Sequence, residues 1–451
     1  MSETAPAPTP WTATRLRLIA GAAVIVLGGL AFLMRDAVGY RVQAATGAIC
    51  FLCLVAAFSN NLRAVNWRTV GWGITLQLAL ALFILKFRIG DVRPGYAMFA
   101  ALAGVAKKFL EFTDAGSHFV FGVLANDTQF GQTVGPANGF IFAFRALPTI
   151  IFVSSFFTVL YYFGVLQIIV RLMARAMMWV MHTSGAETLS VSANVFMGQT
   201  EAPIIVKPFV PRMTQSELLT MMVGGMAHIS GGVMAVYIAI GADPVAILTT
   251  SVMAAPCSLY LSKLLYPETE TPETAGRATA SVEKLHVNAV DAAAGGASDG
   301  LTLALNVGAM LIAFLAFIAL FDWILGLVHN GLSLTKVFSV VFSPIAVLMG
   351  IPRGDVGPMA DLLGTKLVAN EFVAFVKLTG QYKTVMSPRG FILATYALTG
   401  FANISSIGIQ LGGIGGMALT RRGDLARHGW RALFAGFLAT LVNACIASIF
   451  L

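Results

Sequence analysis

The residues best suited to do chemistry lie in the stretch Ser192–Pro211, inside a strongly apolar region of the chain. A carboxylate such as Glu201 is costly at membrane depth unless it faces protein, water or a ligand, so it is a functional candidate by default. Gly198 and Pro203 flank the polar residues and disfavour a continuous helix. We therefore expect two half-helices that meet at a polar tip facing a cavity. The other polar side chains of this tip are Asn194, Gln199 and Thr200.

A second stretch, Gly364–Phe375, has the same character, with Asn370 and Glu371 framed by apolar residues. Each stretch is followed by an apolar run that glycine and small polar residues interrupt, at Gly224–Val233 and at Gly400–Gly413. Two broken hydrophobic units in corresponding places of two halves are typical of a transporter built as an inverted repeat. The sequence thus predicts two hairpins and two unwound helices that converge on one binding site at the repeat interface.

The composition is that of a membrane protein. The chain has 451 residues, of which 57% are hydrophobic and 11% are charged, and its mean hydropathy is +0.81. Soluble domains have about 25% charged residues. At roughly 20 residues per crossing, this length allows about eight to ten spans besides hairpins and surface helices. The lipid bilayer is therefore an expected partner.

The net charge of +8 is better explained by Lys and Arg beside membrane spans than by a nucleic-acid surface. No basic run interleaved with aromatic residues supports nucleic-acid binding. The four cysteines lie inside apolar stretches, and no histidine has the spacing of a known metal motif. We predict no nucleic-acid partner, no cofactor and no certain metal site.

Hydropathy and charge divide the chain into five segments, each with an expected content. They are a tail and first spans (1–94), an interfacial helix, a loop and a long span (95–175), a first hairpin, broken helix and span (176–266), a linker and scaffold helix (267–332), and a second hairpin, broken helix and last span (333–451). The first two segments and the scaffold helix would form a scaffold, and the hairpin segments would form a transport domain in two repeats.

Some local patterns predict individual elements within these segments. Residues 1–14 are rich in Pro, Ala and Thr and read as a disordered tail. Residues 95–121 combine helical apolar spacing with many charges, which favours an amphipathic helix at the interface. The remaining expectations are a polar loop at 126–138, one long, tilted or kinked helix at 140–170, and a linker at 267–300 with a short surface helix near 282–290.

The two acidic residues also allow a purely structural interpretation. Glu201 and Glu371 could pair with Lys207 and Lys366 to neutralise buried charge. The binding interpretation is favoured because each glutamate lies at a helix break beside an amide. A site that recognises hydroxyls and ring edges requires that mixture of acceptors and two-way amides.

The polar residues of the second break have two readings as well. Asn403, Ser405 and Ser406 could satisfy backbone groups freed by unwinding, which is compatible with ligand contact by the same side chains. Phe401 is either core filler or an aromatic wall for a flat ligand. His228 lies at the first break and is either a packing residue or a proton carrier, since imidazole titrates near neutral pH.

Three motifs together resemble the concentrative nucleoside transporter family. They are G-Q-T-E-A-P at Gly198–Pro203, Gly364-x-Lys366 with N-E-F-V-A-F at Asn370–Phe375, and F-A-N-x-S-S-I-G at Phe401–Gly408. They occur in family order and, with their flanking spans, cover roughly Phe140 to Leu451. The resemblance implies an all-α polytopic membrane protein with about eight transmembrane helices, two re-entrant hairpins, two unwound helices and an interfacial amphipathic helix, arranged as an inverted repeat.

The same resemblance implies a function. Members are symporters of the bacterial inner membrane that import nucleosides with sodium ions or protons, usually as homotrimers. Transport is by alternating access and no covalent bond is made, so no enzyme activity and no catalytic residue is expected. By this resemblance, the nucleoside-binding residues are Gln199, Thr200, Glu201, Val233, Glu371, Phe401, Asn403 and Ser406. The cation-coupling residues are Asn194, Met197, His228 and Ile229.

One residue departs from the family pattern. Sodium-coupled relatives tend to have a small hydroxyl residue at the position of His228, and nitrogen is a poor ligand for a hard cation. This favours coupling to protons, while backbone carbonyls could still hold sodium. Two functions of other classes remain as alternatives, a passive nucleoside channel and a membrane-embedded enzyme that uses Glu201 and Glu371 as an acid and base pair.

Overall fold

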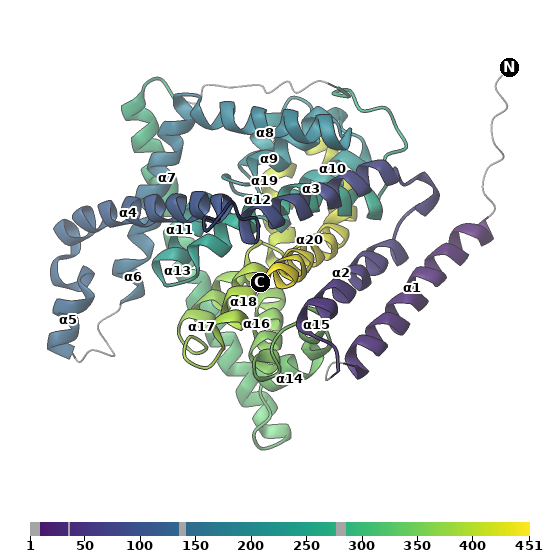
Figure 1. The fold of residues 1–451 in the computed structure, drawn as a ribbon. Helices are drawn as coiled ribbons and strands as arrows, with labels where there is room; N and C mark the ends of the chain where they lie inside the picture. Colours follow the sequence, from purple (N-terminus) through teal and green to yellow (C-terminus); the bar gives the residue numbers. More distant parts are fainter. Residues whose placement is uncertain (1–9, 35–36, 135–140, 277–285) are drawn as a thin grey trace.

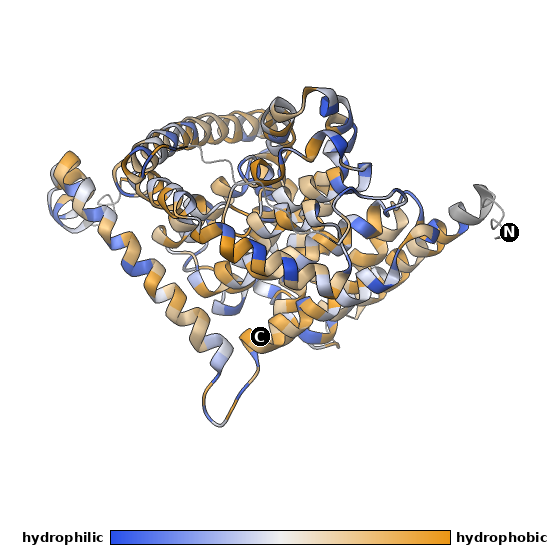
Figure 2. Ribbon diagram, turned by 90° about the horizontal axis from the view of Figure 1, so that it is seen from above, coloured by the Kyte–Doolittle hydropathy of each residue, from blue (hydrophilic) through white to orange (hydrophobic). Residues whose placement is uncertain are grey.

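The computed structural model describes residues 10–34, 37–134, 141–276 and 286–451, and it is a bundle of helices (Figure 1). Within these residues the only extended pairings are two isolated bridges. Hydrophobic residues dominate the outer helices as well as the inner ones (Figure 2). In the described residues, eight helical segments are long and apolar enough to cross a membrane, which agrees with the expected number. They are Thr14–Leu33, Tyr40–Ala57, Trp67–Leu85, Phe142–Tyr162, Gln215–Ala239, Pro244–Leu265, Ala289–Val328 and Leu419–Phe450.

Four helices make up the N-terminal part. They are α1 (Pro10–Leu33), α2 (Tyr40–Ala57), α3 (Trp67–Leu85) and α4 (Pro94–Phe121), with a 3-10 turn at Leu62–Ala64. The prediction of a disordered tail is wrong for residues 10–14, which belong to α1, because proline is tolerated in the first turn of a helix. Residues 1–9 lie outside the described part. The predicted helix at 95–121 is present as α4.

The expected loop at 126–138 is helical over most of its length. After a 3-10 turn at Gly122–Ala125, α5 spans Asp127–Val134. The Asn126 side-chain oxygen accepts a hydrogen bond from the Gln129 backbone N–H at 3.0 Å, so this residue caps the helix instead of continuing a turn. Residues 135–140 lie outside the described part.

The prediction of a single long helix at 140–170 is also wrong. The structure has α6 (Phe142–Arg145), α7 (Leu147–Tyr162) and α8 (Val165–Met181). Gly164 adopts φ 77°, a left-handed conformation that separates α7 from α8 and changes the direction of the chain. In Figure 1, α7 rises from α6 on one side of the molecule, and α8 runs across its top.

The scaffold helix begins earlier than expected. It is α13, which spans Ala289–Val328 and has 40 residues, so the predicted linker ends at residue 288, twelve residues before the expected residue 300. Small residues allow this extension to pack closely on α7: a Cβ on Gly300 would lie 2.8 Å from the Ile151 Cα. Of the short helix expected near 282–290, residues 282–285 lie outside the described part, residues 286–288 are not helical, and residues 289–290 begin α13.

The first hairpin and its broken helix follow α8. The hairpin consists of α9 (Gly185–Ala193) and two 3-10 turns, η4 (Ala202–Val206) and η5 (Val210–Arg212). The broken helix consists of α10 (Gln215–Ala227) and α11 (Gly231–Ala239), and α12 (Pro244–Leu265) follows as a continuous helix.

The second half repeats this order after α13. Two short helices, α14 (Leu334–Val341) and α15 (Ser343–Leu348), precede the hairpin of α16 (Val356–Val368) and α17 (Glu371–Thr379). The broken helix consists of α18 (Pro388–Leu398) and α19 (Ile404–Met417), and α20 (Arg422–Phe450) ends the chain. Short 3-10 turns lie at Arg353–Asp355 and Leu419–Arg421. Because α20 packs against α2, α10, α12, α18 and α19, it joins the two halves.

Candidate functional site

The first hairpin tip is a tight turn between α9 and η4. The Gly198 backbone N–H donates to Glu201 Oε2 at 3.0 Å, and the Glu201 N–H donates to the Gly198 carbonyl at 3.1 Å. These bonds fold the glutamate back over the tip, where its side chain remains exposed. Pro203 stands within the first turn of η4, so no helical hydrogen bond is lost there.

The second hairpin tip places Asn370 and Glu371 at the start of α17. The Asn370 side chain caps this helix by accepting from the Val373 N–H at 2.9 Å. Glu371 is the first helical residue, where a negative charge is stabilised by the helix dipole. Its Oε2 accepts from Asn403 Nδ2 at 2.7 Å and its Oε1 from the Tyr237 hydroxyl at 3.3 Å.

The two broken helices touch each other at their breaks. The Phe401 N–H donates to the His228 carbonyl at 3.0 Å, which joins the second break to the first. Gly400 has φ 149°, and a Cβ there would lie 3.0 Å from the Ala227 carbonyl oxygen. Glycine is therefore required at position 400 by both the backbone conformation and the close approach.

The half-helix that follows each break is also capped at its N-terminus by a side chain. Ser230 Oγ accepts from the Val233 N–H at 3.4 Å, and Asn403 Oδ1 accepts from the Ser406 N–H at 2.9 Å. Asn403 therefore does two things, since its oxygen caps α19 while its nitrogen binds Glu371. The predicted role of Asn403 in satisfying a freed backbone group is therefore present, and its contact with the ligand remains a prediction.

The hairpin tips and the breaks enclose a cavity of about 170 Å³. All eight residues predicted to bind nucleoside line it, although their individual roles remain predictions. Gln199 Nε2 donates to Ser406 Oγ at 3.2 Å across the cavity, so the two halves are in direct contact. The eight residues are Gln199, Thr200, Glu201, Val233, Glu371, Phe401, Asn403 and Ser406.

Other residues complete the wall of this cavity. Ser230, Asn370 and Ser405 belong to stretches that the sequence had singled out for their polarity. The apolar part of the wall comes from α13, which sequence reasoning missed because its residues look like those of any membrane span. Its contributions are Leu303, Val307, Met310 and Leu311, and Phe372 and Ile409 add to them.

The ion pairs that would give the two glutamates a purely structural role do not form within the described residues. Glu201 and Lys207 make no salt bridge, and Lys207 is exposed. Lys366 instead donates to the Ala397 carbonyl at 2.7 Å and to Thr440 Oγ1 at 2.9 Å. The two carboxylates are therefore available to the cavity.

The predicted cation-coupling residues lie behind the first tip. The Asn194 and His228 side chains share Gly224 as a neighbour: His228 Nδ1 lies 2.8 Å from the Gly224 carbonyl oxygen, and a Cβ on Gly224 would lie 3.2 Å from Asn194 Nδ2. Ile229 is fully buried, and Met197 faces a neighbouring cavity. The structure thus brings Asn194 and His228 together, and their coupling role remains a prediction.

His228 has one free ring nitrogen. A carbonyl oxygen can only accept, so Nδ1 carries the hydrogen of its bond to Gly224. The backbone of Ser251 lies close to the ring, but no group in the described residues forms a hydrogen bond with Nε2. Asn194 Oδ1 likewise lacks a partner there. Two unpartnered acceptors thus lie in a buried place between the first tip and the first break.

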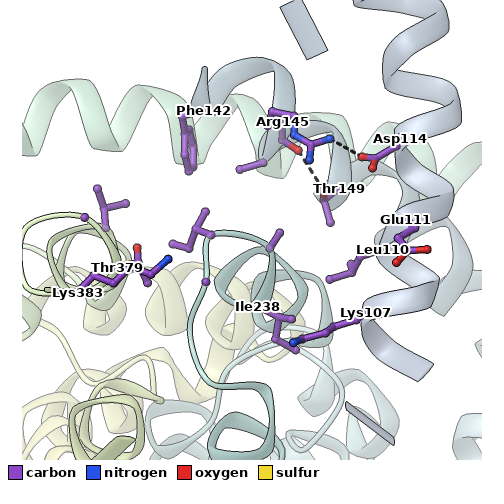
Figure 3. Close-up of a pocket in the computed structure, with 16 residues that line it drawn as sticks. Lys107, Leu110, Glu111, Asp114, Phe142, Arg145, Thr149, Ile238, Thr379 and Lys383 are labelled. Atoms are coloured by element: carbon purple, nitrogen blue, oxygen red, sulfur yellow. Dashed lines mark hydrogen bonds and ion pairs between the residues drawn. The ribbon is translucent and has the colours of Figure 1, made fainter. Parts of the chain in front are cut away.

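Two further cavities lie near the candidate site. One of about 180 Å³ adjoins it and shares Glu201, Ser230 and Leu303 with its wall. A larger one of about 580 Å³ lies between α4, α7 and the ends of α11 and α17 (Figure 3). Its rim carries the ion pair of Arg145 with Asp114 at 2.7 Å, and none of the predicted site residues lines it. We therefore place the candidate site at the smaller cavity between the tips.

Within the part of the chain that the structure describes, no group of three or more His, Cys, Asp or Glu side chains could hold a metal ion. The polar groups of the site are instead one carboxylate per hairpin, with amides and hydroxyls between them. Such a set can bind a neutral, hydroxyl-rich ligand by hydrogen bonds.

Comparisons with known protein families cover most of the chain. Residues 46–124 match the family model described as "Na+ dependent nucleoside transporter N-terminus", and residues 246–448 match its C-terminus. Residues 143–244 between them match a model described as "Nucleoside recognition".

Curated relatives come from animals and bacteria. Mouse sodium/nucleoside cotransporter 1 is 40% identical over 97% of this chain, which spans 68% of that protein. The pig protein of the same name is 41% identical, and 63% of its length is covered. An uncharacterized transporter of Haemophilus influenzae is 40% identical over 90% of this chain and 96% of its own length.

Solved structures of one transporter, CNTnw, have the same fold. Its inward-facing substrate-bound state matches with a TM-score of 0.85 at 36% identity and covers 91% of this chain and 98% of that one. A variant in an outward-facing state also matches with a TM-score of 0.85 and 36% identity, over 91% of this chain and 97% of that one.

Proposed function

The chain belongs to the concentrative nucleoside transporter family, and on that premise we propose that it imports nucleosides across the bacterial inner membrane together with a proton or a sodium ion. It is a multi-pass nucleoside symporter that works by alternating access, and its relatives are transporters and not enzymes. The homotrimer and the inner-membrane location belong to the proposal.

One observation carries the proposal for the site: side chains of both hairpin tips and both helix breaks line one cavity. Glu371, Asn403 and Ser406 would bind the ribose hydroxyls, since a carboxylate, an amide and a hydroxyl lie together there. Val233 and Phe401 would pack against the nucleoside as apolar surfaces. Gln199, Thr200 and Glu201 would face the nucleobase, directly or through water, because amide and carboxylate groups can match the donors of a ring edge.

The same cavity supports alternating access. Its polar wall comes from the hairpins and the broken helices, whereas its apolar wall comes from α13, which packs on α7. We propose that the hairpins and the broken helices move as a transport domain against a scaffold that contains α13 and α7. Such a movement would expose the cavity to each side of the membrane in turn.

The coupling cation would be bound beside His228 and Asn194. The free Nε2 of His228 is suited to take up a proton, and the unpartnered Asn194 oxygen is suited to sodium. The residue at position 228 favours the proton, and sodium coupling remains the alternative because it is what the names of the mammalian relatives state for those proteins.

Uptake of radiolabelled uridine into proteoliposomes tests the function. A symporter accumulates uridine above equilibrium, a channel only equilibrates it, and an enzyme converts it. Applying the pH gradient and the sodium gradient separately identifies the coupling ion. Full accumulation with sodium at equal pH on both sides would contradict proton coupling.

A further inference from the structure

Lys366 is a buried charge on the second hairpin that the proposed binding site does not use. It lies in α16, and its side chain is 0% exposed. Its Nζ donates to the Ala397 carbonyl at 2.7 Å and to Thr440 Oγ1 at 2.9 Å, and it lies 5.6 Å from the centre of the Phe437 ring. Both hydrogen-bond acceptors are neutral.

Other lysines that are mostly buried have carboxylate partners. Lys263 lies 2.6 Å from Glu187 at the base of the first hairpin, and Lys377 pairs with Asp361 in the second. Among the described residues, Lys366 has no carboxylate within ion-pairing distance. Since an ammonium group without such a partner is costly to bury, its surroundings must stabilise the positive charge in another way.

The surroundings of Lys366 provide the end of a half-helix. Ala397 is the penultimate residue of α18, so its carbonyl lies at the negative end of the helix dipole, just before the second break. Thr440 also contacts this break, because its Cγ2 would lie 2.6 Å from a Cβ on Gly400. In transporters with discontinuous helices, such C-terminal ends bind coupling cations. The ammonium group thus stands where a cation would be favoured.

The two repeats differ in the side chain that lies at the end of the first half-helix, before the break. At the end of α10 in the first repeat, a carbonyl faces His228, a side chain that can gain or lose a proton. At the end of α18 in the second repeat, the carbonyl faces the ammonium of Lys366, which is carried by the hairpin helix α16. Glu371 is held by Asn403, which lies just beyond the same break.

We propose that Lys366 is a tethered cation that fixes the second helix break, and thereby positions Asn403 and Glu371 for the ribose hydroxyls. It touches no substrate and is a positioning residue. The inference rests on the proposed function, because it assigns a role within the ribose part of that site. It predicts that removing the charge weakens recognition of the ribose and leaves recognition of the base in place.

The test compares the affinities for uridine and for 2′,3′-dideoxyuridine, which lacks the 2′ and 3′ hydroxyls and keeps the 5′ hydroxyl. The variant Lys366→Met keeps the apolar stem and removes the charge. We expect its affinity for uridine to fall by about ten- to a hundredfold, the range for lost hydrogen bonds to a charged group, while that for the dideoxy compound changes little. The matched control is Lys383→Met, an exposed lysine of the same repeat, which should leave the ratio unchanged. Equal losses for both ligands, or no loss, would overturn the inference.

A second variant covers the case in which Lys366→Met does not fold. Lys366→Ala leaves room for a free cation, so methylammonium chloride should restore the monodisperse peak in size exclusion and the uridine preference, and ethanol should restore neither. Recovery of the fold without the preference, or no recovery of either, would overturn the role of the charge. If the wild-type protein binds no uridine, the proposed function itself fails, which is a different result.

Discussion

At the scale of single residues, Glu371 is the group on which the ribose site depends most. Both of its oxygens accept hydrogen bonds, from Asn403 and Tyr237, and the side chain still lines the cavity. Glu371→Gln keeps the shape but replaces one accepting oxygen with a donor that opposes the Asn403 amide. We expect uridine transport to be abolished, since each lost hydrogen bond to a charged group costs about 1.5–3 kcal/mol. Uptake into proteoliposomes measures the effect.

The control for this change is Glu273→Gln, which removes an exposed carboxylate paired with Arg212. Exposed ion pairs contribute about 0–1 kcal/mol, so this variant should transport uridine normally. The elution volume in detergent should be the same for both variants and the wild type. Normal transport by Glu371→Gln would refute its assigned role.

We expect His228 to determine whether the transporter is coupled to protons or to sodium ions. Its Nε2 lacks a hydrogen-bond partner in the described structure, as does the Asn194 side-chain oxygen, and both side chains lie beside Gly224. His228→Ser replaces the titratable nitrogen with a hydroxyl oxygen, which is a better ligand for sodium. We expect uptake driven by a pH gradient to be lost and uptake driven by sodium to appear or increase.

The measurement is uridine accumulation under each gradient alone, for the wild type and the variant side by side. In the wild type we expect accumulation to rise as the outside is made more acidic, because the protonated imidazole forms on that side. If the variant still follows the pH gradient and ignores sodium, His228 does not carry the coupling proton.

The sequence predicted the polar residues of the site far better than its apolar wall. A glutamate beside an amide within an apolar stretch is costly, so Glu201 and Glu371 stand out from their surroundings. Leu303 and Leu311 of α13 line the same cavity, but leucine in a membrane span is the expected residue with or without a ligand. No signal in one sequence separates them from leucines that face lipid.

At the scale of elements, the crossing of the two breaks holds the site together. The Phe401 N–H binds the His228 carbonyl, and Gly400 lies against the Ala227 and Met226 carbonyl oxygens. Gly400→Ala would place a Cβ 3.0 and 3.1 Å from these oxygens at φ 149°, a conformation that alanine rarely adopts. We expect a loss of stability of about 1–3 kcal/mol and a loss of transport, measured by thermal unfolding in detergent and by uptake.

Gly408→Ala is the matched control, because this glycine lies in α19 with open space at its Cβ position. In a helix, alanine is favoured over glycine by about 1 kcal/mol, so this variant should be as stable as the wild type or more so. A Gly400→Ala protein with normal stability and transport would show that the two breaks are not held in this close contact.

Element boundaries were the part of the fold that the sequence predicted least well. The break at Gly164 was missed because glycine is common in membrane helices, and only the surrounding packing decides whether it turns left-handed. The early start of α13 depends on Gly296 and Gly300 fitting against α7, a contact between residues far apart in the chain. The two hairpins and breaks were predictable because glycine, proline and buried polar groups occur there together.

At the scale of the whole molecule, the candidate cavity is formed by parts that we expect to move relative to each other. Leu311 of α13 lines the same cavity as Glu371 and Asn403, so ligand should fill the space beside it. In a Leu311→Cys variant, bound uridine should slow the reaction of the new thiol with a maleimide by about tenfold or more, because the ligand excludes the reagent. The native Cys50, Cys257 and Cys445 are buried, and Cys53 is replaced by serine to remove a background reaction.

Val287→Cys gives the reference reaction, since Val287 is 87% exposed just before the same helix and lies outside the cavity. Its rate should not depend on uridine. A membrane-impermeant maleimide added to only one side of the vesicles then tests alternating access: Leu311→Cys should react from either side as the molecule cycles, because each state opens the cavity to one side. Reaction from one side alone during active transport would mean that Leu311 never faces the other side, which would contradict this prediction.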